Sequence, residues 1–233
     1  MVEVLAMRNV FVAAALCLLT LTACSSNQSV TKSPGLVFVE QLTQLVRART
    51  EGNVAPPNAA ITLTRQDLAA INAPLIRITA RKSGLVSLLS IAQRNGNAQI
   101  WKTPDNISFT LRDGFLTQTR GLSEDLYATD SSGLQAAIAG TGSATGVVRI
   151  IQRLDGANGL VPVQYRCDVT KPGAENVVVL GQSFATQHYH EVCSGADDSF
   201  TNDYWIDSRG VMRVSQQWVG NDFGHLFMER LID

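Results

Sequence analysis

Four cysteines are the side chains with the widest chemical range in this 233-residue sequence. Cys17 and Cys24 lie close to the N-terminus, whereas Cys167 and Cys193 lie far downstream. A cysteine can form a disulfide, bind a metal, attack a substrate as a thiolate or carry a covalent lipid. Because the compartment of the protein selects among these roles, the N-terminal segment decides how the cysteines are interpreted.

The N-terminal segment has the pattern of a signal peptide. Arg8 precedes an apolar run of about 12 residues, from Val10 to Leu21, whereas a transmembrane helix needs about 20. A cation, a short apolar run and then small residues are typical of an export signal. A start at Met7 gives a more typical signal peptide than a start at Met1, because it omits the acidic Glu3.

This segment ends in Leu21-Thr22-Ala23-Cys24, which looks like a lipobox. In that chemistry diacylglycerol alkylates the Cys24 thiol, the peptide is cut before Cys24, and the new amine is acylated. Two or more acyl chains anchor a protein stably, since each buried CH₂ contributes about 0.8 kcal/mol. The alternative is an ordinary signal peptide with a chance cysteine. We expect residues 1–23 to be a lipoprotein signal peptide and the polar residues 24–35 to be a flexible tether.

The residue after Cys24 bears on the membrane that holds the anchor. It is Ser25 and not Asp. In bacteria that resemble the enteric model, Asp at this position retains a lipoprotein in the inner membrane. Ser25 therefore favours an outer-membrane anchor with the protein facing the periplasm.

Export favours a disulfide between Cys167 and Cys193, because exported proteins meet an oxidising compartment. Closing a loop of roughly 25 residues would stabilise the fold by roughly 3–4 kcal/mol in the chain-entropy model. The functional alternative is a catalytic or metal-binding thiolate. Cys17 is lost with the signal peptide, so one lipid anchor and one disulfide account for all the cysteines.

Two histidines, His188 and His190, are spaced to point to one face of a strand, which is how strand-based metal sites begin. Cys193 has the opposite parity, so it should diverge from both histidines if the strand is regular. His225 could join them only through a contact made by the fold. The simpler interpretation is a pair of half-exposed strand histidines.

The remaining candidates also have structural explanations. Glu124-Asp125 could be paired carboxylates for glycoside chemistry, but adjacent side chains on an extended segment point apart. Asp197-Asp198 with Asp203 could attract calcium, but the spacing fits no EF-hand loop. The glycine-rich segment 140–146 lacks the Gly-Lys-Ser/Thr ending of a phosphate-binding loop. We therefore assign no catalytic residue, no cofactor-binding residue and no metal ligand.

Composition and charge exclude several classes of protein. Hydrophobic residues make up 45% of the chain and charged residues 17%, so residues 36–233 can form a single domain with a real core. The net charge of −1 argues against nucleic acid as a main partner.

The pattern of the domain predicts a mainly β fold: an antiparallel meander that forms a half-open barrel or a curved sandwich, with a few short helices. Helices are expected over 36–49, over 64–71 after the capping box Thr64-x-x-Asp67, and near 134–139. Asn95-Gly96 and Asp113-Gly114 predict tight hairpins. A turn is expected over 171–176. About ten strands are expected, over 75–80, 85–93, up to 101, 107–111, 115–119, 147–154, 160–170, 177–180, 184–193, 204–207, 211–219 and 226–231.

Several short motifs occur in an order that resembles the YjbF/GfcB family of exopolysaccharide and group 4 capsule lipoproteins. They span about residues 36 to 231, and Gln216 departs from the usually basic residue before the last Gln-Trp pair. The motifs are Trp101-x-x-x-Asp105, Leu111-x-Asp113-Gly114, Thr119-Arg120-Gly121-Leu122-x-x-Asp125-Leu126, Tyr165-x-Cys167, Glu191-x-Cys193, Asn202-x-Tyr204-Trp205-Ile206-Asp207, Gly210 and Ser215-x-Gln217-Trp218-Val219-Gly220.

The resemblance implies a β-rich, outer-membrane-anchored periplasmic lipoprotein that takes part in exopolysaccharide or capsule secretion or assembly. Its partners would be the outer membrane, through the lipid, and the polysaccharide or its export machinery. The family offers no established catalytic residue, so we expect no enzyme and no cofactor. One alternative is a half-barrel carrier with an apolar concavity lined by Trp101, Ile107, Phe109 and Leu111. A third is a hydrolase or lyase, which would need convergent groups such as Glu191, His188 and His225 in a cleft.

Overall fold

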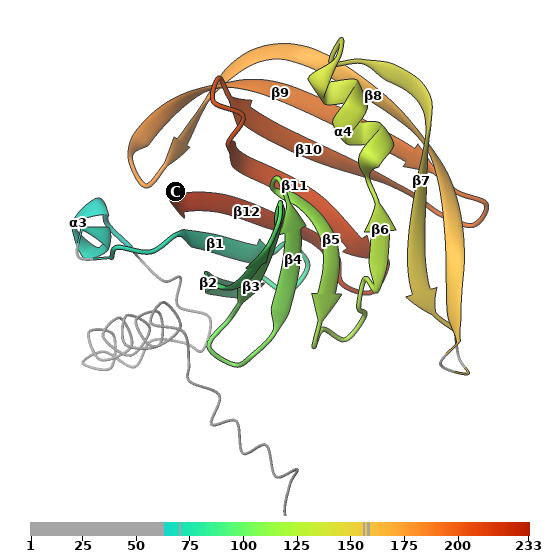
Figure 1. Cartoon of the computed structure of the whole chain (residues 1–233), viewed down its shortest axis with the longest axis horizontal. Helices are drawn as coiled ribbons and strands as arrows, with labels where there is room; N and C mark the ends of the chain where they lie inside the picture. Colours follow the sequence, from blue (N-terminus) through green and yellow to red (C-terminus); the bar gives the residue numbers. More distant parts are fainter. Residues whose placement is uncertain (1–62, 70, 156, 158) are drawn as a thin grey trace, which may run out of the picture. The chain divides into compact units, whose positions relative to one another are not determined.

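The computed structural model describes residues 63–233 except 70, 156 and 158. Twelve strands form one antiparallel sheet, and two short helices lie beside it (Figure 1). The helices are α3 (Arg65–Leu68) and α4 (Ser132–Ala139). The strands are β1 (Leu75–Ala80), β2 (Val86–Asn95), β3 (Ala98–Lys102), β4 (Ser108–Arg112), β5 (Phe115–Arg120), β6 (Ala128–Asp130), β7 (Ala144–Leu154), β8 (Leu160–Val179), β9 (Gln182–Ser194), β10 (Ser199–Asp207), β11 (Met212–Gly220) and β12 (Gly224–Ile232).

The strand order makes the sheet an almost closed barrel with one seam. Strands β1 to β5 follow one another in space, as do β6 to β12, and β1 pairs with β12. The seam therefore falls between β5 and β6, in the middle of the chain. A backbone hydrogen bond of 2.8 Å from the Thr119 N–H to the Leu126 carbonyl bridges the two sides near it. The predicted half-open meander barrel is confirmed.

Alternation along the strands fills the barrel interior with large side chains. Trp101 and Phe109 are directly paired on β3 and β4, and both are almost fully buried. Tyr165, Phe200 and Trp218 pack together by edge and stacked contacts. The interior is a packed core because successive residues of each strand point to opposite faces, and these strands place an aromatic or aliphatic residue at every second position.

Part of the outer face of the sheet is buried as well. Leu75 and Ile76 are neighbours on β1 but belong to different core clusters. The outer cluster includes Leu68 of α3, which the predicted capping box starts: the Thr64 hydroxyl accepts from the Asp67 N–H, and the Asp67 carboxylate accepts from the Thr64 N–H. Burial on both faces explains why β11 is hydrophobic or buried along nearly its whole length.

The second helix, α4, packs against β7 and β8. Its Leu134 shares a third cluster with Phe115, Tyr204 and Met212. The helices predicted at 64–71 and 134–139 are both present, the first in shorter form. The predicted helix over 36–49, the signal peptide over 1–23 and the tether over 24–35 lie outside the described residues.

One prediction about the strands is wrong. A turn was expected over 171–176, but β8 runs through this segment without a break. The register of β8 against β9 shifts between Thr170 and Gly173, so two residues of β8 bulge opposite one residue of β9. A bulge accommodates Pro172, which has no N–H for the ladder, and so the Pro-Gly signal marks an irregularity within a strand.

Candidate functional site

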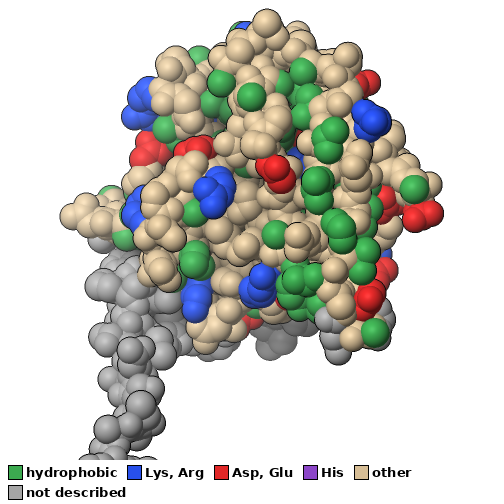
Figure 2. All heavy atoms as spheres, turned by 45° about the vertical axis from the view of Figure 1, so that its right-hand side comes forward, with side chains coloured by type: hydrophobic (Ala, Val, Ile, Leu, Met, Phe, Trp, Pro, Cys, Tyr) green, Lys and Arg blue, Asp and Glu red, His purple; other side chains and the backbone are tan. Residues whose placement is uncertain are grey.

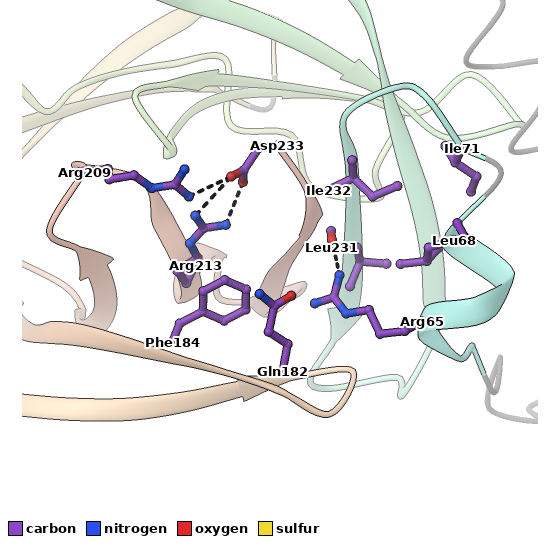
Figure 3. Close-up of a pocket in the computed structure, with 11 residues that line it drawn as sticks. Arg65, Leu68, Ile71, Gln182, Phe184, Arg209, Arg213, Leu231, Ile232 and Asp233 are labelled. Atoms are coloured by element: carbon purple, nitrogen blue, oxygen red, sulfur yellow. Dashed lines mark hydrogen bonds and ion pairs between the residues drawn. The ribbon is translucent and has the colours of Figure 1, made fainter.

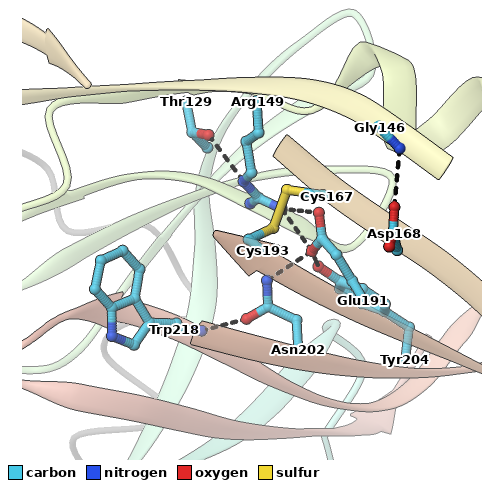
Figure 4. Close-up of a disulfide and its surroundings, with 10 residues drawn as sticks. All are labelled: Thr129, Gly146, Arg149, Cys167, Asp168, Glu191, Cys193, Asn202, Tyr204 and Trp218. Atoms are coloured by element: carbon cyan, nitrogen blue, oxygen red, sulfur yellow. Dashed lines mark hydrogen bonds and ion pairs between the residues drawn. A yellow bond between two sulfur atoms is a disulfide. The ribbon is translucent and has the colours of Figure 1, made fainter. Parts of the chain in front are cut away.

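The disulfide predicted between Cys167 and Cys193 is present. The two residues lie directly opposite each other on β8 and β9, with Cα atoms 4.0 Å apart, and both are fully buried. It faces the barrel interior beside a cluster of polar side chains (Figure 4). The interpretation of these cysteines as a structural staple is confirmed, and their sulfur atoms are not available as thiolates.

The polar cluster next to the disulfide is built on an ion pair between Arg149 of β7 and Glu191 of β9. One Arg149 terminal nitrogen lies 2.9 and 2.8 Å from the two Glu191 oxygens, and the side chains are 5% and 1% exposed. The Asn202 amide and the Tyr204 hydroxyl donate to the second Glu191 oxygen at 2.7 and 2.8 Å. The Asn202 carbonyl oxygen accepts from the Trp218 backbone N–H. Glu191 is thus saturated with donors.

Electrostatics in this cluster oppose acid–base chemistry. Burial alone would lower the pKa of Arg149, but the Glu191 carboxylate and Tyr204 raise it above its ordinary value. Burial and Glu191 raise the pKa of Tyr204 well above its usual range. Glu191 also lies close to both disulfide sulfurs, but a permanent guanidinium holds it, which disfavours a metal ion. The cluster is a satisfied buried network.

Sequence reasoning missed this network. Glu191, Asn202 and Tyr204 appear in the motifs, but nothing in the spacing assigns them to one another. Arg149 belongs to no motif. The one signal was its place in the apolar run 147–154, where a cation on the inward face needs a buried partner.

The two predicted strand histidines meet at one carboxylate. His188 Nε2 and His190 Nδ1 each lie 2.8 Å from the same oxygen of Asp203. The His188 ring stacks on Trp205 with centroids 4.6 Å apart, and the Trp205 indole N–H donates to Glu175 at 2.8 Å. The side chains of His188 and His190 are 18% and 33% exposed, as the structural interpretation predicts.

The third histidine has a separate partner. His225 Nε2 lies 2.8 Å from the Thr201 carbonyl. Cys193 points into the core, whereas His188 stacks on Trp205, which packs with the outer cluster. The opposite parity of Cys193 and the histidines is therefore confirmed.

The adjacent carboxylates Glu124 and Asp125 have different structural partners. Glu124 pairs with Arg153 at 2.9 Å and accepts the backbone N–H groups of Asp222 and Phe223, so it ties its loop to β7 and to the β11–β12 turn. Asp125 accepts from the Thr119 hydroxyl and from the N–H groups of Gly121 and Leu122.

The other candidate segments also have structural partners. Asp198 accepts from Asn221, whereas Asp203 belongs to the histidine pair. In the glycine-rich segment, the Gly146 N–H donates to Asp168 at 2.9 Å, which is a contact to a carboxylate of the protein itself. These residues form tight local structure.

A pocket of about 370 Å³ lies between α3, the start of β9 and the ends of the β11–β12 hairpin strands (Figure 3). Sequence reasoning did not find it, because its walls come from distant segments. Its size is within the range of small-ligand sites. The lining residues are Arg65, Leu68, Ala69, Ile71, Gln182, Phe184, Arg209, Arg213, Leu231, Ile232 and Asp233.

Most charges of this pocket are already paired within the protein. Arg213 is 3% exposed, binds Asp207 at 2.8 Å and Asp233 at 2.6 Å, and lies over the Phe184 ring. Burial would raise the pKa of Asp207, but the N–H groups of Val211 and Arg209 and the Arg213 guanidinium lower it below its ordinary value. Arg65 donates to the backbone carbonyls of Leu231 and Val179, both at 2.9 Å.

In the part of the chain that the structure describes, no helix is long and apolar enough to cross a membrane. Comparison with solved structures finds a hypothetical lipoprotein, YmcC, from Escherichia coli K12. It is 18% identical in sequence, with a TM-score of 0.64 over 82% of this chain and 95% of that chain. At this identity the likeness concerns the fold, and it agrees with the meander barrel described above. A search of curated proteins finds no match.

A family model described as "Group 4 capsule polysaccharide lipoprotein gfcB, YjbF" matches residues 35–231. This range contains the disulfide, the Arg149–Glu191 network and the Glu124 tie. It covers nearly all of the chain after the expected signal peptide and tether. The chain belongs to the YjbF family of group 4 capsule polysaccharide lipoproteins.

Proposed function

We propose that the protein is a non-catalytic lipoprotein, anchored in the outer membrane and facing the periplasm, that takes part in secretion or assembly of an exopolysaccharide or capsule. The observation that carries the proposal is the family match over residues 35–231. Membership in a capsule polysaccharide lipoprotein family places the protein in the cell envelope. The lipobox ending in Cys24, followed by Ser25, supports the finer assignment to the outer membrane.

The chemistry of the core supports a non-catalytic role. Glu191, the only buried carboxylate of the motifs beside the disulfide among the described residues, is held by three side-chain donors. His188 binds Asp203 and His225 binds a backbone carbonyl. The convergence of Glu191, His188 and His225 that a hydrolase or lyase would need is therefore not supported by their partners.

A carrier function has less support. It predicts an open apolar concavity, but Trp101, Phe109 and Leu111 are 0%, 2% and 3% exposed within the packed core. The interior cavity that touches Leu111 has a volume of about 10 Å³. A lipid chain cannot enter such a space without displacing core side chains.

Deletion of the gene, with measurement of surface polysaccharide, tests the proposal. We expect reduced surface polymer and restoration by the wild-type gene. Normal polymer export in the deletion strain would contradict a role in secretion or assembly.

The anchor is tested separately by Cys24→Ala. This variant should leave the outer-membrane fraction and appear in the soluble periplasm. Cys17→Ala is a matched control, because Cys17 precedes the expected cleavage site and its loss should leave fractionation unchanged. Ser25→Asp should move the protein to the inner membrane in a host with enteric-type sorting. Continued outer-membrane association of Cys24→Ala would refute lipidation at this residue.

A further inference from the structure

Arg230 is an interior cation on β12. It pairs with Ile76 of β1 in the register, and Met228 and Leu226 precede it on the same face, in the interior core. Its guanidinium lies over the ring of Trp101, with the central carbon 4.7 Å from the ring centroid. Trp101 itself is fully buried. The cation thus sits on an aromatic wall at one end of the barrel.

This guanidinium has no hydrogen-bond or ion-pair partner anywhere in the described part of the chain. Its Nε–H is buried and unpaired, and so is the indole N–H of Trp101 beside it. The two deeply buried arginines of the fold differ, because Arg149 and Arg213 each bind at least one carboxylate. The indole N–H of Trp205 likewise donates to Glu175. Arg230 and Trp101 therefore stand out as two adjacent donors without an acceptor.

Burial makes this arrangement unfavourable for the protein alone. Desolvation, with Arg213 and Arg94 nearby, lowers the pKa of Arg230 to about 10, although Asp233 opposes the shift. Asp233 is already bound by Arg213 and Arg209, so it cannot serve Arg230 equally well. Buried cations and N–H donors in native proteins are normally paired, and an orphaned pair indicates a missing acceptor.

The missing acceptor must reach Arg230 from solvent. The cavity lined by Arg230, Leu111 and Met228 is about 10 Å³, which is room for about one water molecule. Arg230 is half-buried, in contrast to Trp101, so its terminal nitrogens remain accessible from outside. An oxyanion at the side of the guanidinium can accept from Nε and one terminal nitrogen together, which is the bidentate geometry that arginine favours.

We propose that Arg230, supported by Trp101, is a binding site for an oxyanion, a carboxylate or a phosphate, carried by an acidic polysaccharide segment. The choice of a glycan as the source rests on the proposed function, whereas the anion chemistry rests on the two unpaired donors. Lysine could not replace Arg230, because a single ammonium has neither the planar fork nor the stacking surface.

The site can be tested on the full mature protein, purified with its lipid in detergent at low ionic strength. The probes are sodium glucuronate, inorganic phosphate and the neutral sugar glucose, and the readouts are calorimetric affinity and the midpoint of thermal unfolding. We expect at least one anion to bind and to raise the midpoint, whereas glucose does neither. Comparison of the two anions distinguishes a carboxylate site from a phosphate site.

Substitutions assign the binding to this position. Arg230→Gln and Arg230→Lys should weaken anion binding by roughly tenfold or more. Trp101→Phe keeps the ring and removes only the N–H, and should weaken it less. Arg166→Gln is the matched control, since Arg166 is an exposed arginine of β8 and its loss should leave the affinity unchanged.

A measurement without ligand keeps the proposal falsifiable if Arg230→Gln binds poorly because it is damaged. If Arg230 is an unpaired binding group, Arg230→Met should not lower the unfolding midpoint of the ligand-free protein, because it removes an uncompensated buried charge. A lower midpoint for Arg230→Met, or unchanged anion binding in Arg230→Gln, would overturn the proposal. Binding is measured in vitro, so a deletion strain with normal polysaccharide would refute the proposed function without touching this site.

Discussion

Arg149 of β7 and Glu191 of β9 are joined across the intervening strand β8 by a fully buried ion pair. The pair lies next to the disulfide, and Asn202 and Tyr204 of β10 donate to the same carboxylate. Four neighbouring strands of the barrel, β7 to β10, are thus connected at one point by side chains as well as by their backbone ladders.

Removing one partner of this pair should destabilise the fold strongly. Arg149→Met or Glu191→Ala leaves an unpaired buried charge, which costs about 3–5 kcal/mol of unfolding free energy. Chemical denaturation measures the effect. The double variant Arg149→Met/Glu191→Met should recover part of the loss. As a control, Arg209→Gln removes an exposed arginine that pairs with Asp233, and should change the free energy by less than about 1 kcal/mol. Single variants as stable as wild type would contradict a structural role for the pair.

The disulfide should contribute a separate increment. It closes a loop with a sequence separation of 26 residues, for which the chain-entropy model gives roughly 3–4 kcal/mol. Cys167→Ala/Cys193→Ala should lower the free energy of unfolding by about that amount. Dithiothreitol should lower the stability of the wild-type protein and leave that of the double variant unchanged. A wild-type protein equally stable with and without reductant would show that the staple contributes little.

The sequence predicted the parts of this fold that depend on local pattern. Period-two alternation and the Asn95-Gly96 and Asp113-Gly114 turns predicted hairpins that are present, and the parity of Cys193 against His188 and His190 placed the thiol and the imidazoles on opposite faces. The parts that failed depend on pairing between distant strands. Nothing local assigns Arg149 to Glu191, and the signal at Pro172 is compatible with either a turn or a bulge.

The loop between β5 and β6 should depend on a glycine that faces its carboxylate. A side-chain carbon built on Gly220 would collide with the Glu124 carboxylate. Gly220→Ala should therefore displace Glu124 from Arg153 and from the β11–β12 turn, and should cost about 1–3 kcal/mol. In a double-mutant cycle, Glu124→Ala should reduce the cost of Gly220→Ala, because the colliding group is gone. Additive effects of the two substitutions would show that the collision is not the cause.

Acid should weaken the Arg213 cluster. The pKa values of Asp207 and Asp233 are lowered in the fold because hydrogen bonds and Arg213 outweigh the effect of burial. A lowered folded pKa stabilises the protein above the ordinary carboxyl value of about 4, and this stability is lost as the pH falls through the folded values. Denaturation midpoints should thus drop below about pH 4. The curves of wild type and Asp207→Asn should converge at low pH, and a constant gap between them would contradict this assignment.

The seam should depend on Gln217, whose side chain does the work of a missing strand. The Gln217 carbonyl oxygen accepts from the Leu116 backbone N–H at 2.8 Å, and its amide donates to the Gly114 carbonyl at 2.9 Å. Leu116 lies on the edge strand β5, where no ladder partner beyond β4 takes this N–H. Gln217→Met keeps the approximate volume but orphans a buried donor, which costs about 1–3 kcal/mol. Hydrogen exchange at the Leu116 amide should become faster by a corresponding factor. Gln216→Met is a matched control, because the neighbouring glutamine contacts only the exposed Arg81 in the described structure. Equal protection of the Leu116 amide in wild type and Gln217→Met would show that the seam is held by other contacts.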